Sequence, residues 1–428
     1  MEISRAVYTG LAFAALPFVP LKLWWRGRRE PGYRRAIGER FGRYATSTSA
    51  HRTPLFWVHA VSVGETRAAL PLMQRLRSAY PAAAILLTHM TAAGREAGRT
   101  LLGDSVIQAW LPYDLPFAVR AFLRRFTPVA GFLLETELWP NLIAEASASG
   151  IPVFLINARL SERSARGYAR FPALTQPMLP RLEGIAAQSG DDAARFVGLG
   201  APRPAVTGNL KFDLAVPNEA RALGAEFRLR FGATRPLWIA ASTRDGEEAI
   251  ILDAMSRLPL PAAALTLIVP RHPQRFEAVA ELLRRRGIAF MRRSTNAPVP
   301  ADVRVVLGDS MGEMLAYYAA ADVAFVGGSL LPFGAHTLIE PLSVATPVLI
   351  GPHTFNFAEA TDNAVSAGAA IRVGDADALV ANVARLLADA SARARMADAA
   401  RRFHAEHQGA ADRMWTWLAP QLAKRISY

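Results

Sequence analysis

The sequence predicts an α/β protein with two doubly wound parallel sheets, one in each half of the chain. From Pro54 onward, short and fully apolar runs alternate with longer amphipathic runs, a pattern typical of parallel strands covered by helices on both faces. The alternation stops around residues 209–236 and then starts again. With 428 residues, 51% of them hydrophobic and 20% charged, the chain is long enough for two globular domains.

Six apolar runs in each half are the predicted strands, and helical segments separate them. The first set is 55–61, 82–88, 105–111, 129–135, 151–157 and 184–189, with an amphipathic helix over 66–79. The second set is 237–242, 264–270, 303–309, 323–329, 347–352 and 370–373. Two helices, roughly 375–407 and 410–425, are expected to end the chain.

Two successive Rossmann-like domains joined by a short linker are the architecture of many glycosyltransferases, the GT-B type. We place the first domain at 44–212, the second at 213–408 and a C-terminal helix at 409–428. Ligands of such sheets bind at the carboxyl ends of the strands, so the active site is expected in the cleft between the domains. One fused long domain is the alternative.

The first 43 residues are predicted to be a membrane anchor with a basic juxtamembrane segment. Residues 6–21 are sixteen positions without a charge, slightly fewer than the roughly 20 that cross a bilayer. Pro17 and Pro20 weaken this run as a continuous helix. Arginines follow the run, whereas a cleavable signal peptide carries its charge before it. We therefore expect a retained anchor, spanning or interfacial, with the bulk of the protein in the cytoplasm; a buried core helix is the alternative.

The positive charge of the chain is concentrated beside this run. Residues 1–43 hold nine basic and three acidic side chains, which supply +6 of the total net charge of +13. Basic side chains in that position favour an anionic membrane surface as the partner. They give no support to nucleic acid as a partner.

Several kinds of chemistry are excluded by what the sequence lacks. The chain has no cysteine, and therefore no disulfide, thiolate nucleophile, zinc–cysteine site or iron–sulfur ligand. It also lacks the phosphate loop G-x-x-x-x-G-K-[ST], the dinucleotide motif G-x-G-x-x-G after a strand, and H-E-x-x-H. We expect an enzyme without a bound metal or cofactor, in which helix N-termini, backbone amides and arginines stabilise charge.

Four charged residues of the first half lie where predicted strands end or where the domains join. Glu65, in WVHAVSVGE, stands at the start of a helix and suits a general base; alternatively it only complements the helix dipole, which would lower its pKa. Glu135 and Glu137, in LLETELWPN, indicate either a polar site or a salt bridge to nearby arginines. Lys211, in GNLKFD, is one of three lysines and suits neutralising a phosphate or carboxylate; a surface lysine is the alternative.

The run NARLSERSARGY, at 157–168, also follows a predicted strand. Its three arginines, hydroxyl groups and tyrosine suit an anionic sugar or a phosphate. The alternative is the solvated start of a helix.

Four strand-to-helix junctions of the second half carry glycine, serine, histidine or arginine, which predicts a nucleotide site. They are STRDGEE, PRHPQRF, SMGEM and GGSLLPFGAHTLIEP, with GPHTFNF one strand later. Arg244 is expected to reach a phosphate at a helix N-terminus. Ser310 is expected to cap a helix, with Glu313 completing a capping box and nearby amides free to hold a phosphate. Glu340 is expected to accept both ribose hydroxyls of a nucleotide sugar.

These runs, in this order, resemble the 3-deoxy-D-manno-octulosonic acid (Kdo) transferases, the lipid A glycosyltransferases of Gram-negative bacteria. The resemblance rests on WVHAVSVGE, LPYDLP, ETELWPN, NARLSERSARGY, GNLKFD, STRDGEE, PRHPQRF, the MGE loop, FVGGSL and GPHTFNF, from about residue 55 to 360. It implies a GT-B fold and transfer of Kdo from CMP-Kdo to the 6′-hydroxyl of a tetraacyl disaccharide lipid A precursor (lipid IVA), with anomeric inversion. It also implies a location at the cytoplasmic face of the bacterial inner membrane.

The resemblance implies roles for individual residues as well. Glu65 matches the general base of the family, and Glu135 and Lys211 match groups that stabilise the transition state. The segments that hold CMP correspond to Arg271, His272, Met311, Gly312, Glu313, Thr337, Leu338, Ile339 and Glu340. Arg244 is a candidate for the donor phosphate or carboxylate from its position alone.

One loop departs from the family pattern. Where many relatives read GGHN-P-L-E-P, this chain has Ala335 in place of glycine and Thr337 in place of asparagine. The alanine is expected to tighten the loop, and any contact made by the asparagine side chain is lost. Because Glu340 is kept, we expect activity to be retained.

Overall fold

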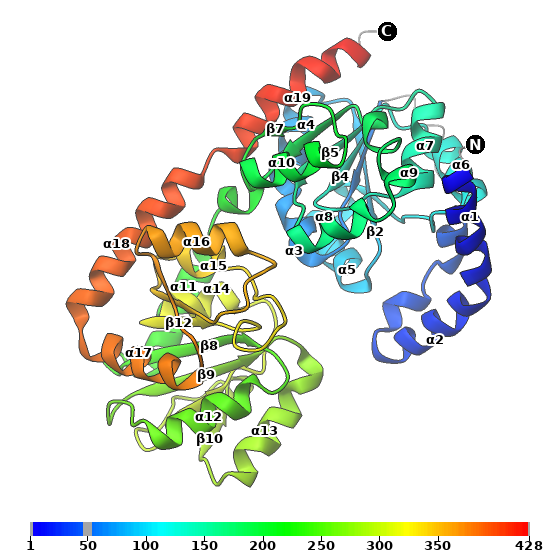
Figure 1. Cartoon of the computed structure of the whole chain (residues 1–428). Helices are drawn as coiled ribbons and strands as arrows, with labels where there is room; N and C mark the ends of the chain where they lie inside the picture. The colour runs from blue at the N-terminus through cyan, green and yellow to red at the C-terminus, as the bar shows by residue number, and fades with distance from the viewer. Residues whose placement is uncertain (1–2, 46–53, 427–428) are drawn as a thin grey trace. The chain divides into compact units, whose positions relative to one another are not determined.

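The computed structural model describes residues 3–45 and 54–426, which form two compact units (Figure 1). The first unit is Met1–Leu214 together with Gln408–Tyr428, and the second is Ala215–His407. The C-terminal helix therefore belongs to the first unit, an assignment that the sequence pattern did not indicate.

The first unit is built on a parallel sheet of seven strands in the order β3-β2-β1-β4-β5-β6-β7. The strands are β1 Leu55–His59, β2 Ala84–His89, β3 Ile107–Trp110, β4 Ala130–Leu134, β5 Val153–Ala158, β6 Gly184–Ala187 and β7 Ala205–Val206. The six predicted strands are confirmed. The seventh was missed because two residues are too few to show a period.

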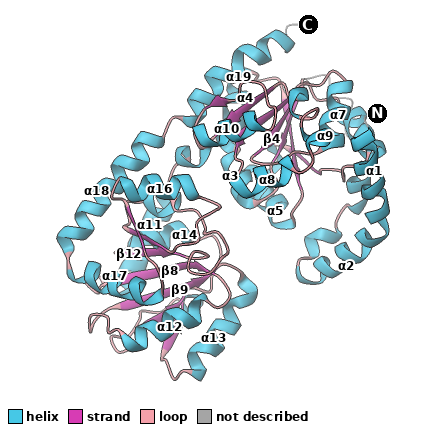
Figure 2. Cartoon of the chain, viewed as in Figure 1, coloured by secondary structure: helices cyan, strands magenta, loops and turns pink. Residues whose placement is uncertain are grey.

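Helices cover both faces of this sheet (Figure 2). They are α3 Val63–Ala68, α4 Leu70–Ala79, α5 Ala92–Leu102, α6 Pro116–Phe126, α7 Pro140–Ala148, α8 Glu162–Ala169, α9 Pro172–Thr175, α10 Gly190–Gly198 and α19 Ala410–Ile426. Neighbouring side chains of β1 enter different cores. Trp57 packs with residues of α6, α7 and α10, whereas Phe56 packs with residues of α4 and α19. The helix predicted over 66–79 is two helices, because Pro71 opens a new first turn in α4.

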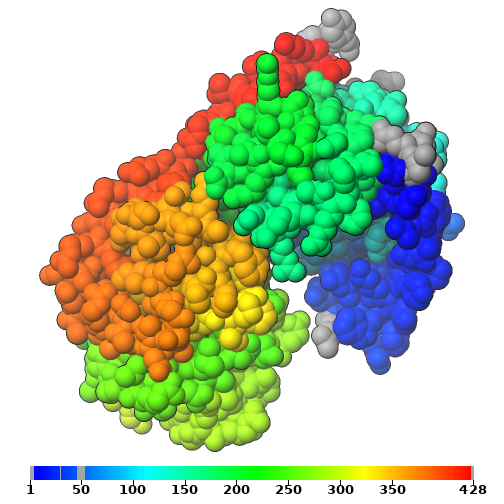
Figure 3. All heavy atoms as spheres, viewed as in Figure 1, coloured from blue at the N-terminus to red at the C-terminus, as the bar shows by residue number. Residues whose placement is uncertain are grey.

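The N-terminal segment is a helical run on the outside of the first unit, dark blue in Figure 3. It consists of α1 Ile3–Ala15, the 3-10 turn η1 Leu16–Phe18 and α2 Val19–Arg29. Pro17 lies in the 3-10 turn and Pro20 in the first turn of α2, and neither proline ends the helical run. The stretch Ser4–Arg28 is long and apolar enough to cross a membrane, with a mean hydropathy of 1.5, and only 11% of its apolar window is buried. This exposure argues against the buried core helix that the sequence left open.

The basic segment after this run is partly structural. It continues in two 3-10 turns, η2 Pro31–Arg34 and η3 Ile37–Phe41. The Arg40 side chain is only 1% exposed and lies over the Trp110 ring, 3.9 Å from its centroid. Glu39 accepts hydrogen bonds from the Trp110 amide at 2.9 Å and from Arg95 at 3.2 Å. Arg40 is therefore not among the charges available to a membrane surface.

The second unit repeats the architecture with a parallel sheet in the order β10-β11-β9-β8-β12-β13-β14. The strands are β8 Leu237–Thr243, β9 Leu265–Pro270, β10 Phe290–Arg292, β11 Val305–Leu307, β12 Val323–Val326, β13 Val348–Ile350 and β14 Ala370–Arg372. The six predicted strands are again present. The half-buried edge strand β10 was missed, because it is short and contains an arginine.

The helices of the second unit are α11 Asn218–Phe231, α12 Glu247–Arg257, α13 Phe276–Arg285, α14 Met314–Ala320, α15 Ile339–Ser343, α16 Ala358–Ser366, α17 Ala376–Ala388 and α18 Ala390–His407. The single helix predicted over 375–407 is two helices. Asp389 leaves the helical conformation and its carboxylate accepts the Ala392 amide at 2.8 Å, which starts α18.

Each sheet has a point where the strand order reverses, between β1 and β4 in the first unit and between β8 and β12 in the second. Loops at the carboxyl ends of such strands diverge and leave a crevice for ligands. Four of the sequence motifs singled out above, those with Glu65, Glu135, Arg244 and Gly327, follow the strands at these two points, β1, β4, β8 and β12.

Candidate active site

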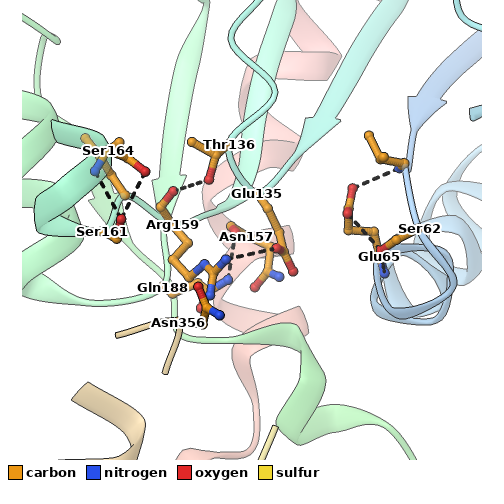
Figure 4. A network of polar contacts seen from close by, with 12 residues as sticks. Ser62, Glu65, Glu135, Thr136, Asn157, Arg159, Ser161, Ser164, Gln188 and Asn356 are labelled. Carbon is orange, nitrogen blue, oxygen red and sulfur yellow. Dashed lines mark hydrogen bonds and ion pairs between the residues drawn. The ribbon is translucent and has the colours of Figure 1, made fainter. Parts of the chain in front are cut away.

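Glu65 is fixed at the first turn of α3, just beyond the end of β1. Ser62 caps this helix, and its hydroxyl accepts the Glu65 amide at 3.3 Å and donates to Glu65 Oε1 at 2.9 Å. The Val61 amide donates to Glu65 Oε2 at 2.8 Å (Figure 4). The carboxylate is therefore held in one orientation by its own turn.

The environment of Glu65 raises its pKa well above the usual value for a glutamate. Burial, with a smaller contribution from the charge of Glu135, raises the pKa of Glu65 to about 7, although the bonds from Val61 and Ser62 oppose the rise. The start of the helix lowers this pKa, as the sequence analysis considered, but desolvation outweighs that effect and the net shift is upward. A carboxylate with a pKa near 7 is well matched to general base catalysis at neutral pH.

Glu135 lies one residue beyond β4 in a left-handed conformation, with φ at 57°. Arg159 Nη2 is 3.9 Å from its Oε2 (Figure 4). Lys211 Nζ donates to Oε1 of Glu135 at 2.7 Å. Burial would raise the pKa of Glu135, but Lys211 and Arg159 hold it below its usual value. The salt bridge that the sequence left open is present, and it keeps a negative charge beside Glu65.

Lys211 is not a random surface lysine. It lies on the 3-10 turn η6 Leu210–Asp213, and its side chain is 17% exposed. Asn209 Oδ1 accepts the Lys211 amide at 3.0 Å, and Asn157 Oδ1 accepts the Leu210 amide at 3.0 Å. These bonds fix the turn that presents the ammonium group to Glu135.

Two buried residues of this region stand in runs that the sequence analysis singled out but were given no role of their own. His59 ends β1, is fully buried, and its Nε2 is 3.7 Å from a carboxylate oxygen of Glu137. Asn157 is also fully buried and adopts a φ of 48°, and its Nδ2 has no hydrogen-bond partner among residues 3–45 and 54–426. Asn157 ends a predicted strand and His59 lies two positions before the end of another, and those positions were the available signal.

The arginines of the run 157–168 do not act together. Arg159 turns toward Glu135, whereas Arg163 and Arg166 lie on the exposed face of α8. Ser161 caps this helix and accepts the Ser164 amide at 3.1 Å. The solvated helix start therefore describes most of the run, and only its first arginine joins the site.

A basic cluster lies at the carboxyl ends of β8, β9 and β12 in the second unit. Arg244 Nη1 donates to His272 Nε2 at 3.0 Å, and its guanidinium lies 4.7 Å from the Phe333 ring centroid. The Nε2 atom of His336 is buried and finds no hydrogen-bond partner in the part of the chain that the structure describes. Burial and the neighbouring charges of Arg271 and Arg244 lower the pKa of His336 to about 3, so this imidazole is neutral. His336 and Phe333 were not singled out from the sequence.

The predicted capping box at Ser310 is wrong. Helix α14 begins at Met314, and Glu313 occupies the cap position without a side-chain cap bond. Gly312 has a φ of 83°, which places a turn between Ser310 and the helix. The Ser310 hydroxyl instead donates to the Glu313 carboxylate, which also binds Arg293 at 2.8 Å. Met311 is 60% exposed.

The described residues, 3–45 and 54–426, contain no group of three or more histidine, aspartate and glutamate side chains that could hold a metal ion. Basic side chains and backbone amides are the groups these regions offer to an anionic ligand.

Comparison with known proteins identifies the family. A family model described as 3-deoxy-D-manno-octulosonic-acid transferase matches residues 35–214, and one described as glycosyl transferases group 1 matches 290–403. The 3-deoxy-D-manno-octulosonic acid transferase of Bordetella pertussis is 43% identical over 97% of this chain and 100% of its own length. The chain belongs to the 3-deoxy-D-manno-octulosonic acid transferase family.

Other relatives agree with this assignment. The Haemophilus influenzae protein of the same name is 39% identical over 99% of this chain and 100% of its own length. Among solved structures, Anabaena HepE in complex with UDP matches with a TM-score of 0.59 and 15% identity, over 87% of this chain and 100% of that chain. At this identity the structural match supports the GT-B type fold alone, as the sequence predicted.

The loop that departs from the pattern of the Kdo transferase family is well formed in this chain. Ala335 adopts a left-handed φ of 67°, is 4% exposed and donates its amide to Gly328 O at 2.6 Å. Thr337 Oγ1 accepts the Ile339 amide at 3.3 Å, so the hydroxyl supports the start of α15. Leu338 and Ile339 are buried, at 0% and 3% exposure. Neither residue therefore presents much surface, of side chain or of backbone, to a ligand.

Replacing Ala335 with glycine is expected to stabilise the protein, because a left-handed conformation strains a side chain with Cβ. The gain is at most about 1 kcal/mol, since glycine also gains freedom in the unfolded chain. Thermal unfolding is expected to shift upward by about 2–4 °C for a unit of this size. Glycine at Ala367, which has an ordinary φ of −75°, is the control and is expected to lower the unfolding temperature.

Proposed function

We propose that this protein transfers Kdo from CMP-Kdo to the 6′-hydroxyl of a tetraacyl disaccharide lipid A precursor, with inversion at the anomeric carbon, in lipopolysaccharide synthesis. The observation that carries the proposal is Glu65, with its pKa near 7, beside a glutamate held ionised by Lys211. The near full-length match to named Kdo transferases supports the donor sugar.

In this mechanism Glu65 is the general base. It takes the proton of the acceptor hydroxyl while the oxygen attacks the anomeric carbon of Kdo. The new glycosidic bond forms as the bond from that carbon to the phosphate oxygen breaks, and CMP leaves with the electron pair. The orientation of Glu65, set by Val61 and Ser62, supports this role because base catalysis requires a fixed carboxylate.

Glu135 and Lys211 are proposed to stabilise the transition state. A positive centre develops at the anomeric carbon as the leaving group departs, and the ionised Glu135 is a negative charge held in place before the reaction. Lys211 and Arg159 keep this carboxylate ionised even though it is buried. The 2.7 Å ion pair also fixes its direction.

The second unit is proposed to bind CMP-Kdo, which carries a phosphate and a carboxylate. Arg244, Arg271 and His272 supply positive charge or hydrogen bonds at the carboxyl ends of β8 and β9. The remaining proposed CMP contacts come from two loops and are Met311, Gly312, Glu313, Thr337, Leu338, Ile339 and Glu340. Glu340 lies in the first turn of α15, where its carboxylate suits the ribose hydroxyls.

Mass spectrometry of a purified reaction tests the function. The protein is incubated with lipid IVA and CMP-Kdo, and with UDP- and GDP-sugars as competing donors. A product heavier by one or more Kdo units, formed with CMP-Kdo alone, is the expected result, and the mass gives the number of units. Transfer from another donor, or conversion of a donor without transfer, would favour a different nucleotide-sugar transferase or an epimerase.

We further propose that the N-terminal helical run holds the protein at the cytoplasmic face of the inner membrane. Leu11, on α1, is 66% exposed. Replacing it with aspartate costs roughly 2.5–3.5 kcal/mol at the centre of a bilayer, and is expected to move the protein from the membrane to the soluble fraction. Leu229, on α11, is 71% exposed, and the same replacement there is expected to change nothing. Equal behaviour of both variants in liposome flotation would contradict the anchor.

A further inference from the structure

Glu247 is a fully buried carboxylate that binds four backbone amides. It is the first residue of α12 and is 0% exposed. Its Oε2 accepts the amides of Arg244 at 2.8 Å and Gly328 at 2.6 Å. Its Oε1 accepts the amides of Ser329 and Leu330, both at 3.0 Å. One side chain thus joins the loop after β8 to the loop after β12.

The loop that Glu247 binds after β12 also forms hydrogen bonds with other parts of the same sheet end. Gly328 O accepts the Ala335 amide at 2.6 Å, and Gly327 O accepts the His336 amide at 3.1 Å. The Ser329 hydroxyl accepts the Gly351 amide at 2.9 Å, which ties in the loop after β13. Three loops at the carboxyl end of the sheet are therefore connected through the residues that Glu247 binds.

The contacts between these loops leave little room for independent movement. A Cβ on Gly351 would lie 2.3 Å from Ser329 O, and one on Gly327 would lie 2.7 Å from Ala241 O. Such approaches of backbone to backbone require glycine. A change in the position of residues 328–330 must therefore be transmitted to Ala335 and Gly351.

Only a carboxylate satisfies the four amides at once. It has two oxygens, each with room for two donors, whereas an amide side chain has one oxygen and an NH2 group. Glutamine at this position would turn a donor toward two backbone donors and leave them buried without acceptors, which is costly. The four amide donors therefore require a carboxylate at position 247, whereas packing alone would also accept the similarly sized glutamine.

We propose that Glu247 is the positioning residue of the donor site: it sets the placement of the loops that carry Arg244 and residues 335–340 and does not touch the donor. The inference rests on the proposed binding of CMP-Kdo by the second unit. Loss of the carboxylate is therefore expected to weaken donor binding, although Glu247 itself does not touch the donor.

The test compares Glu247→Gln with a matched variant at the opposite end of the same strands. Asp322 precedes β12, and its carboxylate accepts the Leu237 amide at the start of β8 at 2.8 Å and binds Arg228 at 3.1 Å. Asp322→Asn also removes a carboxylate that holds backbone, but far from the donor loops. Calorimetry with CMP, steady-state kinetics and thermal unfolding are measured for the full-length protein.

Glu247→Gln is expected to raise the Kd for CMP and the KM for CMP-Kdo by about tenfold or more, with the acceptor KM unchanged. Asp322→Asn is expected to lower the unfolding temperature and leave the Kd for CMP within about twofold. If Glu247 had only a structural role, Glu247→Gln would lower the unfolding temperature, and its Kd for CMP would stay as close to that of the unchanged protein as the Kd of Asp322→Asn. That result would overturn the proposal.

Glu247→Asp keeps the charge and shortens the side chain by one methylene, and it decides the question if the glutamine variant fails to fold. The affinity of Glu247→Asp for CMP is expected to lie between those of the unchanged protein and Glu247→Gln. If Glu247→Gln does not fold, the affinity of Glu247→Asp is expected to be clearly lower than that of the unchanged protein. CMP affinity equal to that of the unchanged protein would contradict the positioning role. Absence of CMP binding by the unchanged protein would instead contradict the proposed function on which the inference rests.

Discussion

Replacing Glu65 with alanine is expected to abolish sugar transfer while leaving CMP binding unchanged. The side chain removes the proton from the acceptor hydroxyl in our mechanism, and loss of a general base typically lowers the rate by about 10²–10⁴-fold. Its carboxylate is bound only within its own turn, to Ser62 and Val61, among the hydrogen bonds of the described residues. The residues that we propose to bind the donor lie in the other unit, so the affinity for CMP is expected to stay the same.

The measurement is Kdo transfer from CMP-Kdo at pH 8, where Glu65 is ionised, combined with calorimetry with CMP. Glu219 is the control, because it is an exposed glutamate in the first turn of another helix, α11. Its alanine variant is expected to transfer Kdo at the rate of the unchanged protein. Substantial turnover by the Glu65 variant would show that another group is the base.

Replacing Glu135 with glutamine is expected to lower the transfer rate and to shift its pH dependence to lower pH. The rate falls because a fixed negative charge near the reacting centre is lost, an effect on the order of 10²-fold. The pH dependence shifts because the charge of Glu135 is the second cause, after burial, of the raised pKa of Glu65. Without that charge, Glu65 loses its proton more readily, and Lys211 adds to the effect once its partner is neutral.

The profile of kcat/KM against pH checks the sign of this effect. A base is active when deprotonated, so the unchanged protein is expected to gain activity as the pH rises through about 7. In Glu135→Gln the midpoint of this rise is expected at lower pH. Glu137 contributes less to the pKa of Glu65, so Glu137→Gln is expected to give a smaller shift. An unchanged or higher midpoint in Glu135→Gln would contradict the coupling of the two carboxylates.

The framework of both sheets could be predicted because its strands are buried on both faces. Runs such as 55–61 and 264–270 are continuous in apolar residues, and only a covered parallel sheet explains a series of them. The two missed strands, β7 and β10, are short edge strands in which burial leaves no comparable pattern. The break at Asp389 was missed because an aspartate inside a charged helical run is equally compatible with an exposed helix position.

The positions of several candidate residues at strand ends could be predicted from the sequence, but their electrostatics could not. Glu65 and Lys211 stand in runs whose order matches a known family, and strand ends marked Glu135 as well. The direction of the pKa shift of Glu65 depends on how deeply the carboxylate is buried and on Glu135, seventy positions away in sequence. For the same reason, Arg40 was grouped with the exposed arginines, although tertiary contacts place it among aromatic rings.

The return of the chain to the first unit has a consequence for biosynthesis. The second unit is one continuous stretch, Ala215–His407, whereas the first is completed by α19. Met414, Leu418 and Leu422 of this helix are fully buried in the same core as Phe56 of β1. During synthesis, α4 therefore covers only part of this face of the first sheet, and the rest stays uncovered until α19 has been made. The domain that starts the sequence is the last to be finished.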